Sequence, residues 1–219
     1  EQKGDEEGGS EAQGALEAAF GKVGISDSSR VVIYAGTDSV SAATRVWFTL
    51  DYLGAGSRVS LLDGGLAAWR GEGRPLSTAT PAVAPARFTA RPQPDRLADA
   101  SWIAARLKDP GMVLLDARTP DFHSGRNAGP MPRAGRIPGA RNLPANDLIG
   151  PDRKLRPELL AQLAGPDAAR QPVVIYCHIG QLATVLYFSA RYLGLDARLY
   201  DGSFQDWSAR ADLPVEGNR

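Results

Sequence analysis

The chain has 219 residues, 43% of them hydrophobic, and its 25 lysine and arginine residues balance its 25 aspartate and glutamate residues. This balance gives no reason to expect binding to nucleic acid or to an anionic membrane surface, and no apolar run of about 18 residues predicts a membrane span. The single cysteine excludes an internal disulfide and a CxxC redox motif. Because only two histidines accompany it, we expect no metal site, and no motif calls for a cofactor.

The first ten residues, Glu1 to Ser10, are rich in glycine and glutamate, which predicts a solvated lead-in without fixed structure. A helix is expected at 15–20 and a strand at 31–34. The pattern of a secretion signal, a charged segment followed by an apolar one, is not found. We therefore expect a cytoplasmic protein, and the alternative is a periplasmic or exported protein whose leader is not part of this sequence.

Three segments of the first half recur in the second half in the same order, which predicts an internal repeat. Their offsets are 142 (173 − 31), 140 (193 − 53) and 138 (200 − 62), as two homologous units with small loop differences would give. The matched pairs are Val31–Tyr34 with Val173–Tyr176, Leu53-Gly54 with Leu193-Gly194, and Leu62–Trp69 with Tyr200–Trp207.

A proline-rich stretch separates the two copies. Residues 77–95 contain Pro81, Pro85, Pro92 and Pro94, which favour extended backbone and oppose a packed helix. We therefore predict a first domain at 1–76, a linker at 77–95 and a second domain at 96–219.

The second copy alternates between predicted helices and short apolar strands. Continuous apolar strands separated by helices indicate an α/β fold in which helices flank a parallel sheet. In such sheets, functional sites form beyond the carboxyl ends of the strands. The expected helices are 99–108, 157–163, 183–193 and a short one from Asp206, and the expected strands are 112–116, 173–176 and 197–200.

The first copy is shorter than the second. It has no counterpart of residues 113–118 or 135–140. Either a segment upstream of Glu1 is absent from this sequence, or the first domain lacks part of its sheet. We favour the former, because an open parallel sheet without its inner strands would expose apolar edges.

Cys177 follows the second copy's strand at 173–176 and precedes five loop residues and a helix. Successive amides in such a turn form a concavity that binds anions, and the N-terminus of the helix adds a partial positive charge. Both effects favour the thiolate, which is the nucleophilic form of cysteine. Gly180 is expected to give the turn the positive φ that a tight loop needs. A small buried core thiol is the alternative interpretation.

Several motifs in this order resemble the tandem-domain rhodaneses, which are thiosulfate and 3-mercaptopyruvate sulfurtransferases. The resemblance covers about residues 15 to 210 and implies two rhodanese-like domains, the first of them incomplete. The motifs are the doubled unit, the loop after Cys177, Leu115–Arg118, Gly135–Asn142 and Asp201–Trp207.

The resemblance implies that Cys177 takes a sulfane sulfur from a small donor, holds it as a persulfide and passes it to a thiophilic acceptor. Two-step transfer of this kind is covalent catalysis. Ala35 matches Cys177 in the first copy, so that domain is expected to be inactive and either to cover the cleft or to serve as packing. The expected substrate-binding residues are His178, Ile179, Gly180, Gln181, Leu182, Ala183, Arg118 and Arg136, and Asp116 and Trp207 are expected to support the site.

Two sulfur donors, thiosulfate and 3-mercaptopyruvate, have to be compared. No fixed positive side chain lies in His178–Leu182, although His178 could be partly protonated near neutral pH. Asp121 stands where mercaptopyruvate enzymes would be expected to have an arginine. We predict thiosulfate as donor, with cyanide or a thiol as acceptor, and keep 3-mercaptopyruvate as the alternative.

The sequence also bears on two other functions of a reactive cysteine, phosphatase and persulfide carrier. A cysteine phosphatase would need C-x5-R, but the sixth residue after Cys177 is Ala183. A persulfide carrier that serves a protein acceptor is the non-enzymatic alternative.

Five aromatic or polar residues complete the sequence predictions. Trp207 and its counterpart Trp69 are expected in the core. Phe204 and Gln205 are candidates for the mouth of the cleft, and His123 is expected at the surface.

Overall fold

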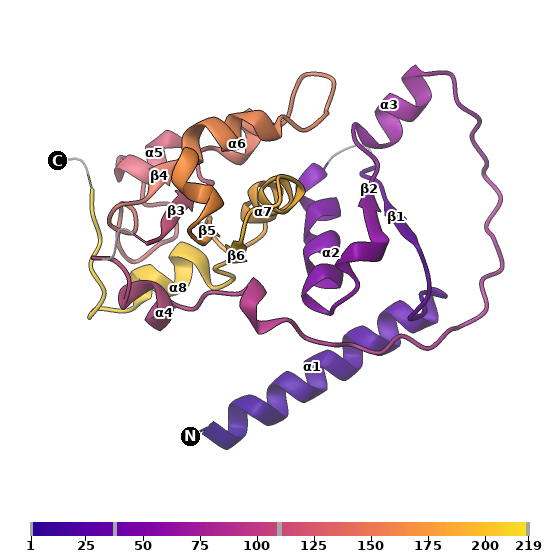
Figure 1. Cartoon of the computed structure of the whole chain (residues 1–219), viewed down its shortest axis with the longest axis horizontal. Helices are drawn as coiled ribbons and strands as arrows, with labels where there is room; N and C mark the ends of the chain where they lie inside the picture. The colour runs from indigo at the N-terminus through magenta and orange to yellow at the C-terminus, as the bar shows by residue number, and fades with distance from the viewer. Residues whose placement is uncertain (1, 37–38, 109–110, 218–219) are drawn as a thin grey trace.

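The computed structural model describes residues 2–36, 39–108 and 111–217 and contains two parallel sheets (Figure 1). None of the helices within these ranges is long and apolar enough to cross a lipid bilayer. The elements are α1 (Gln2–Lys22), β1 (Val31–Ile33), α2 (Val40–Tyr52), η1 (Gly56–Arg58), β2 (Val59–Leu61), α3 (Gly65–Gly71), η2 (Pro94–Arg96), α4 (Ala100–Ala104), β3 (Val113–Asp116), α5 (Pro120–Ser124), β4 (Arg141–Asn142), η3 (Ala145–Leu148), α6 (Pro157–Ala164), η4 (Pro166–Ala169), β5 (Val173–Tyr176), α7 (Ala183–Tyr192), β6 (Ala197–Leu199) and α8 (Ser203–Ala209).

The second unit, α4 to α8, is built on a four-stranded parallel sheet in the order β4-β3-β5-β6. Alternate residues of its central strands face two different cores, because successive side chains in a strand point to opposite faces. Val173 and Ile175 pack toward α6 and α7. Val174 and Tyr176 pack toward α4 and α8. This two-sided burial confirms the predicted α/β architecture.

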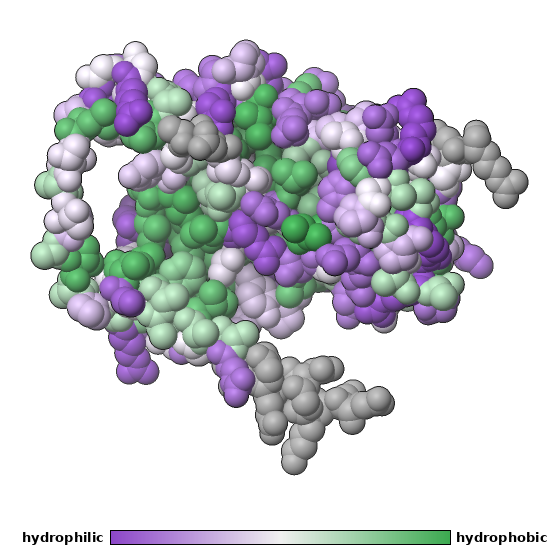
Figure 2. All heavy atoms as spheres, turned by 180° about the vertical axis from the view of Figure 1, so that it is seen from behind, coloured by the Kyte–Doolittle hydropathy of each residue, from purple (hydrophilic) through white to green (hydrophobic). Residues whose placement is uncertain are grey.

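The first unit, α1 to α3, has only a two-stranded parallel sheet, β1-β2. Its residues Val32 and Tyr34 match the fully buried Val174 and Tyr176, yet they are 62% and 57% exposed. The described residues of this unit hold no counterparts of β3, β4 or α4, so one layer of the sandwich is missing here. Apolar side chains accordingly gather on this half of the molecule, beside the linker (Figure 2).

The repeat predicted from the sequence is also visible in the packing of α2 on α7. Trp47 packs on Phe188, and Phe48 packs on Tyr187, both with ring centroids 4.9 Å apart and nearly perpendicular planes. Because residues 47 and 48 match 187 and 188, the two contacts exchange under a pseudo-twofold axis. Such an interface is isologous, as in a symmetric dimer.

Polar groups support the same contact between the units. Thr44 and its counterpart Thr184 share a hydrogen bond of 2.8 Å between buried hydroxyls. The Tyr187 hydroxyl donates to the buried carboxylate of Asp51 over 2.7 Å. Of the two cores of the molecule, the one that α2 and α7 cover is therefore shared by both units.

The linker is extended, as its prolines predict, but only its first part is free of the body. Figure 1 shows it arching away after α3 and returning beneath the first unit. Its second part packs there: Ala86 N–H donates to the Gly21 carbonyl of α1, and Phe88 is buried against Phe20.

Three sequence predictions about elements need correction. Residues 2–10, expected to lack fixed structure, belong to helix α1, while Glu1 lies outside the described residues. Helix α4 is shorter than predicted and ends at Ala104, and α8 begins at Ser203 instead of Asp206. The early start of α8 places Ser203 directly against the loop that follows Cys177.

Truncation of Phe48 should show that the two units share a core. We expect Phe48→Ala to lower the free energy of unfolding by about 3–5 kcal/mol, because it empties a fully packed site. Val46→Ala is the matched control, since Val46 lies on the same helix but is exposed, and it should change stability by less than about 0.5 kcal/mol. Urea unfolding followed by circular dichroism measures both. Equal effects would contradict a shared core.

Candidate active site

Cys177 lies directly after β5, at the carboxyl end of the sheet, and is 1% exposed. Its backbone is held on both sides. The Cys177 N–H donates to the Ser203 hydroxyl over 3.1 Å, and its carbonyl accepts from the Phe204 N–H over 3.0 Å. Cys177 is the only cysteine of the sequence, directly precedes the loop formed by residues 178–182, and belongs to the buried core that α7 covers.

The loop turns at Gly180, whose φ is +83°, as the sequence predicted. The backbone N–H groups of this loop differ from those of the neighbouring elements in their hydrogen bonding. Within the described part of the chain, the amides of residues 178–182 have no hydrogen-bond acceptor. Successive backbone N–H groups without a partner in a turn are available to an anion.

Gly180 also leaves no room for a side chain. A Cβ at this position would come within 2.5 Å of the Asp201 carboxylate and 2.7 Å of the Asp201 carbonyl oxygen. The segment after β6 therefore lies directly against the turn. Both the backbone conformation and the space require glycine here.

Ser203 is a residue beside Cys177 that the sequence reasoning missed. It is fully buried and has φ of 54°, a left-handed conformation that is rare for residues other than glycine. Its hydroxyl donates to the Tyr200 carbonyl while it accepts from Cys177. The counterpart in the first unit is Gly65, with φ of 57°. A strained non-glycine residue beside the only thiol is a known type of site marker.

A buried charged cluster lies beside the loop. Asp116 accepts three side-chain hydrogen bonds from Arg118, of 2.6 to 3.2 Å, and others from His123 and Tyr176. Burial alone would raise the pKa of Asp116, but the bonds from His123 and Arg118 hold that pKa below its ordinary value. The carboxylate is therefore ionised and fixes the strand end.

Arg118 is buried and engaged. Its guanidinium bonds Asp116 and the Gly135 carbonyl, and it lies 4.0 Å from the centre of the Phe204 ring. These contacts favour its structural role over direct contact with a donor. Phe204 is itself buried, so it does not line the mouth of a cleft as predicted, whereas Gln205 is exposed.

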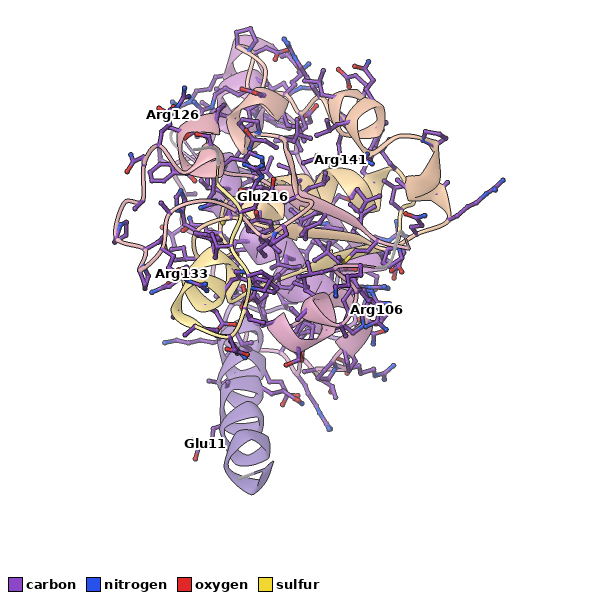
Figure 3. All side chains as sticks on the ribbon, turned by 90° about the vertical axis from the view of Figure 1, so that its left-hand side faces the viewer. Glu11, Arg106, Arg126, Arg133, Arg141 and Glu216 are labelled. Carbon is purple, nitrogen blue, oxygen red and sulfur yellow. The ribbon has the colours of Figure 1, made fainter. Side chains whose placement is uncertain are left out.

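Arg136 is also paired: it bonds the Glu216 carboxylate, and its backbone forms an antiparallel bridge with the same residue. Arg133 donates to four carbonyls between residues 207 and 213 and so fastens the C-terminal segment (Arg133 and Glu216 are labelled in Figure 3). The side chains of both arginines are therefore engaged by other groups of the protein.

The two histidines differ from their predicted states. His123 was expected at the surface, but its side chain is only 15% exposed and bonds Asp116. Burial and the nearby Arg118 guanidinium lower the pKa of His178 below its ordinary value, with Asp116 opposing them. Both effects disfavour the partial protonation of His178 that the sequence led us to expect near neutral pH. Its ring packs edge-on against Phe122 instead, with centroids 4.4 Å apart.

Asp121 and the tryptophans can also be placed. Asp121 is exposed and pairs with the exposed Arg126. Trp207 is fully buried, as predicted, and its ring N–H donates to the Pro214 carbonyl. Trp69 makes the same type of bond to Pro75 but is only half-buried, because the first unit lacks the layer that covers Trp207.

A cavity of about 280 Å³ lies between the two units next to the loop. Leu182 and Val185 come from the second unit's loop and α7, and Ser39 and Ser41 come from the start of α2. Cys177 does not line this cavity. Arg153, which the sequence reasoning did not single out, does line it and has a positive φ of 61°.

Comparison with known proteins agrees with this geometry. The model of the rhodanese-like domain matches residues 99–210. A "Probable 3-mercaptopyruvate sulfurtransferase" of Pseudomonas aeruginosa is 37% identical over 197 residues, which are 88% of this chain and 69% of that protein. The chain belongs to the rhodanese family of sulfurtransferases.

Two further comparisons extend the match to both units. A "Putative thiosulfate sulfurtransferase" of Mycobacterium leprae is 34% identical over 212 residues, covering 90% of this chain and 74% of that protein. The anaerobic ergothioneine biosynthesis enzyme of Chlorobium limicola shares the fold, with a TM-score of 0.78 and 22% identity. That match covers 93% of this chain but only 55% of that one. Together these matches indicate a tandem rhodanese arrangement.

Replacement of Gly180 should disable this rhodanese loop while the fold survives. We expect Gly180→Ala to lower the rate of sulfur transfer at least tenfold, because its Cβ would push Asp201 and the loop apart. Gly194→Ala is the matched control: Gly194 also has positive φ but has open space around it, so it should lose only about 1–2 kcal/mol of stability. Thermal unfolding and sulfur-transfer rates distinguish the two. Normal transfer by Gly180→Ala would refute the need for glycine.

The state of His178 can be tested by pH titration. We expect the NMR titration midpoint of its imidazole to fall below about 6.5, because burial and Arg118 disfavour the cation. The unfolded chain would then bind a proton that the folded chain does not, so stability should fall as the pH drops through 6.5. The His178→Asn variant assigns the signal and should weaken this pH dependence. A midpoint above 6.5 would contradict the burial argument.

Proposed function

We propose that this protein transfers a sulfane sulfur from thiosulfate to cyanide or a thiol through a persulfide on Cys177. One observation carries the proposal: the only cysteine of the sequence directly precedes a turn whose amides have no acceptor among the described residues. Such a turn stabilises both a thiolate and a persulfide anion. No second cysteine is available for disulfide exchange.

The proposed reaction has two balanced steps. The Cys177 thiolate attacks the outer sulfur of thiosulfate, the S–S bond breaks, and sulfite leaves with the electron pair. Cyanide then attacks the outer sulfur of the persulfide, the new S–S bond breaks, and thiocyanate leaves while the thiolate is restored. No proton or external oxidant is consumed, and ping-pong kinetics follow from the covalent intermediate.

Asp121 supports thiosulfate over 3-mercaptopyruvate as the donor. In this chain a carboxylate stands where the family resemblance leads one to expect an arginine in mercaptopyruvate enzymes, and Arg126 pairs with it on the surface. The charge that would hold the carboxylate of mercaptopyruvate is thereby removed from that position. The identity to the Pseudomonas aeruginosa relative keeps mercaptopyruvate as the competing donor in the experiment.

Steady-state kinetics with both donors test the proposal. We expect kcat/KM to be higher for thiosulfate than for 3-mercaptopyruvate, and we expect intact mass spectrometry to find one added sulfur after incubation with thiosulfate alone. Cys177→Ser should abolish both signals. A higher kcat/KM for 3-mercaptopyruvate would reverse the assignment of the donor. Persulfide formation without transfer to cyanide or small thiols would favour a sulfur carrier that serves a protein acceptor.

A further inference from the structure

One ion pair joins the first unit to the segment that lies against the loop after Cys177. Arg45 on α2 binds the carboxylate of Asp201, in the segment that follows β6, through both of its terminal nitrogens. The Nη2–Oδ2 distance is 3.2 Å. Both side chains are partly exposed, so the pair contributes little to stability. The importance of the pair lies instead in its position next to the turn at Gly180.

Asp201 places a negative charge against the turn. Its carboxylate lies on the outer side of Gly180, so close that a Cβ there would be 2.5 Å from it. The same turn carries the amides without acceptors. An unneutralised carboxylate at this point would oppose the thiolate, the persulfide and an approaching anionic donor.

The pseudo-symmetry of the molecule shows that the cation is specific to the active side. The counterpart of Asp201 in the first unit is Asp63, which accepts the Leu155 N–H over 2.8 Å. The counterpart of Arg45 in the second unit is Val185, at the offset of 140. Among the described residues, the repeated carboxylate thus pairs with an arginine across the interface in the copy that has the cysteine, and no such pair is found for Asp63.

We propose that Arg45 is a positioning residue of the active site, whose guanidinium neutralises Asp201 and so preserves the positive field of the loop around Cys177. The inference rests on the proposed function for its kinetic consequences. It gives the inactive first unit a role in the reaction beyond packing, because that unit supplies the charge.

Charge neutralisation and simple tethering predict different results for a double variant. Loss of Arg45 alone exposes the carboxylate, so Arg45→Gln should lower kcat/KM for thiosulfate on the order of fivefold, mainly through a higher KM. Asp201→Asn alone should have little effect or a slight gain. The combination of both should return to within about twofold of the wild type, because no charge remains uncompensated.

Two controls sharpen the kinetic comparison. The defect of Arg45→Gln should shrink as ionic strength rises, because the exposed charge is screened. Arg74→Gln, which removes another exposed, paired arginine of the first unit, should leave the KM unchanged. If Arg45 only tethers the units, then Arg45→Gln, Asp201→Asn and the double variant will be equally slow. That result would overturn the proposal.

A chemical readout separates this inference from the proposed function. The single thiol can be alkylated with iodoacetate, an anion, or with iodoacetamide, which is neutral, at one fixed pH. We expect Arg45→Gln to slow the reaction with iodoacetate more than the reaction with iodoacetamide, and Asp201→Asn to restore the ratio. An unchanged ratio would overturn the inference. Absence of thiosulfate turnover in the wild type would instead refute only the proposed function.

Discussion

The packing of α2 on α7 is the contact on which the rest of the molecule depends. Paired aromatic rings, a shared threonine hydrogen bond and the buried Asp51 carboxylate join the two units. The helices meet around a pseudo-twofold axis, so their N-terminal ends and the loops before them lie at the same end of the interface. This arrangement brings the start of α2 beside the loop of Cys177, where the two units share a cavity.

A buried hydrogen-bond network around Asp116 supports the strand ends that precede the loop after Cys177. Asp116 is ionised although it is buried, because Arg118, His123 and Tyr176 direct hydrogen-bond donors at it. Removal of one member of such a network would leave a charge without a partner in the interior, which is costly. The network lies at the ends of β3 and β5, so it fixes the strand edge from which Cys177 and its turn begin.

Much of this arrangement could be predicted from the sequence. The repeated Val-Val-Ile-Tyr strand, the position of Cys177 and the glycine in the turn depend on local pattern, and each was found where it was expected. Contacts between distant segments could not be read in the same way. His123 looked like a loop residue because only its partner Asp116, on another element, reveals its burial. The pair of Arg45 with Asp201 joins residues 156 positions apart, and no local pattern marks it. The one sequence signal for the positive φ of Ser203 is Gly65, which stands in the matching place of the repeat.

The contrast between Ser203 and Gly65 has a practical consequence for engineering. In the copy without a cysteine, the tight corner before the last helix is made by the residue best suited to its backbone. The copy with the cysteine has Ser203 there. This residue adopts a backbone conformation that favours glycine, but its hydroxyl accepts a hydrogen bond from the Cys177 amide. Engineering for stability by backbone preference alone would choose glycine at this corner. That substitution would remove the hydroxyl acceptor, so a gain in stability would be set against activity.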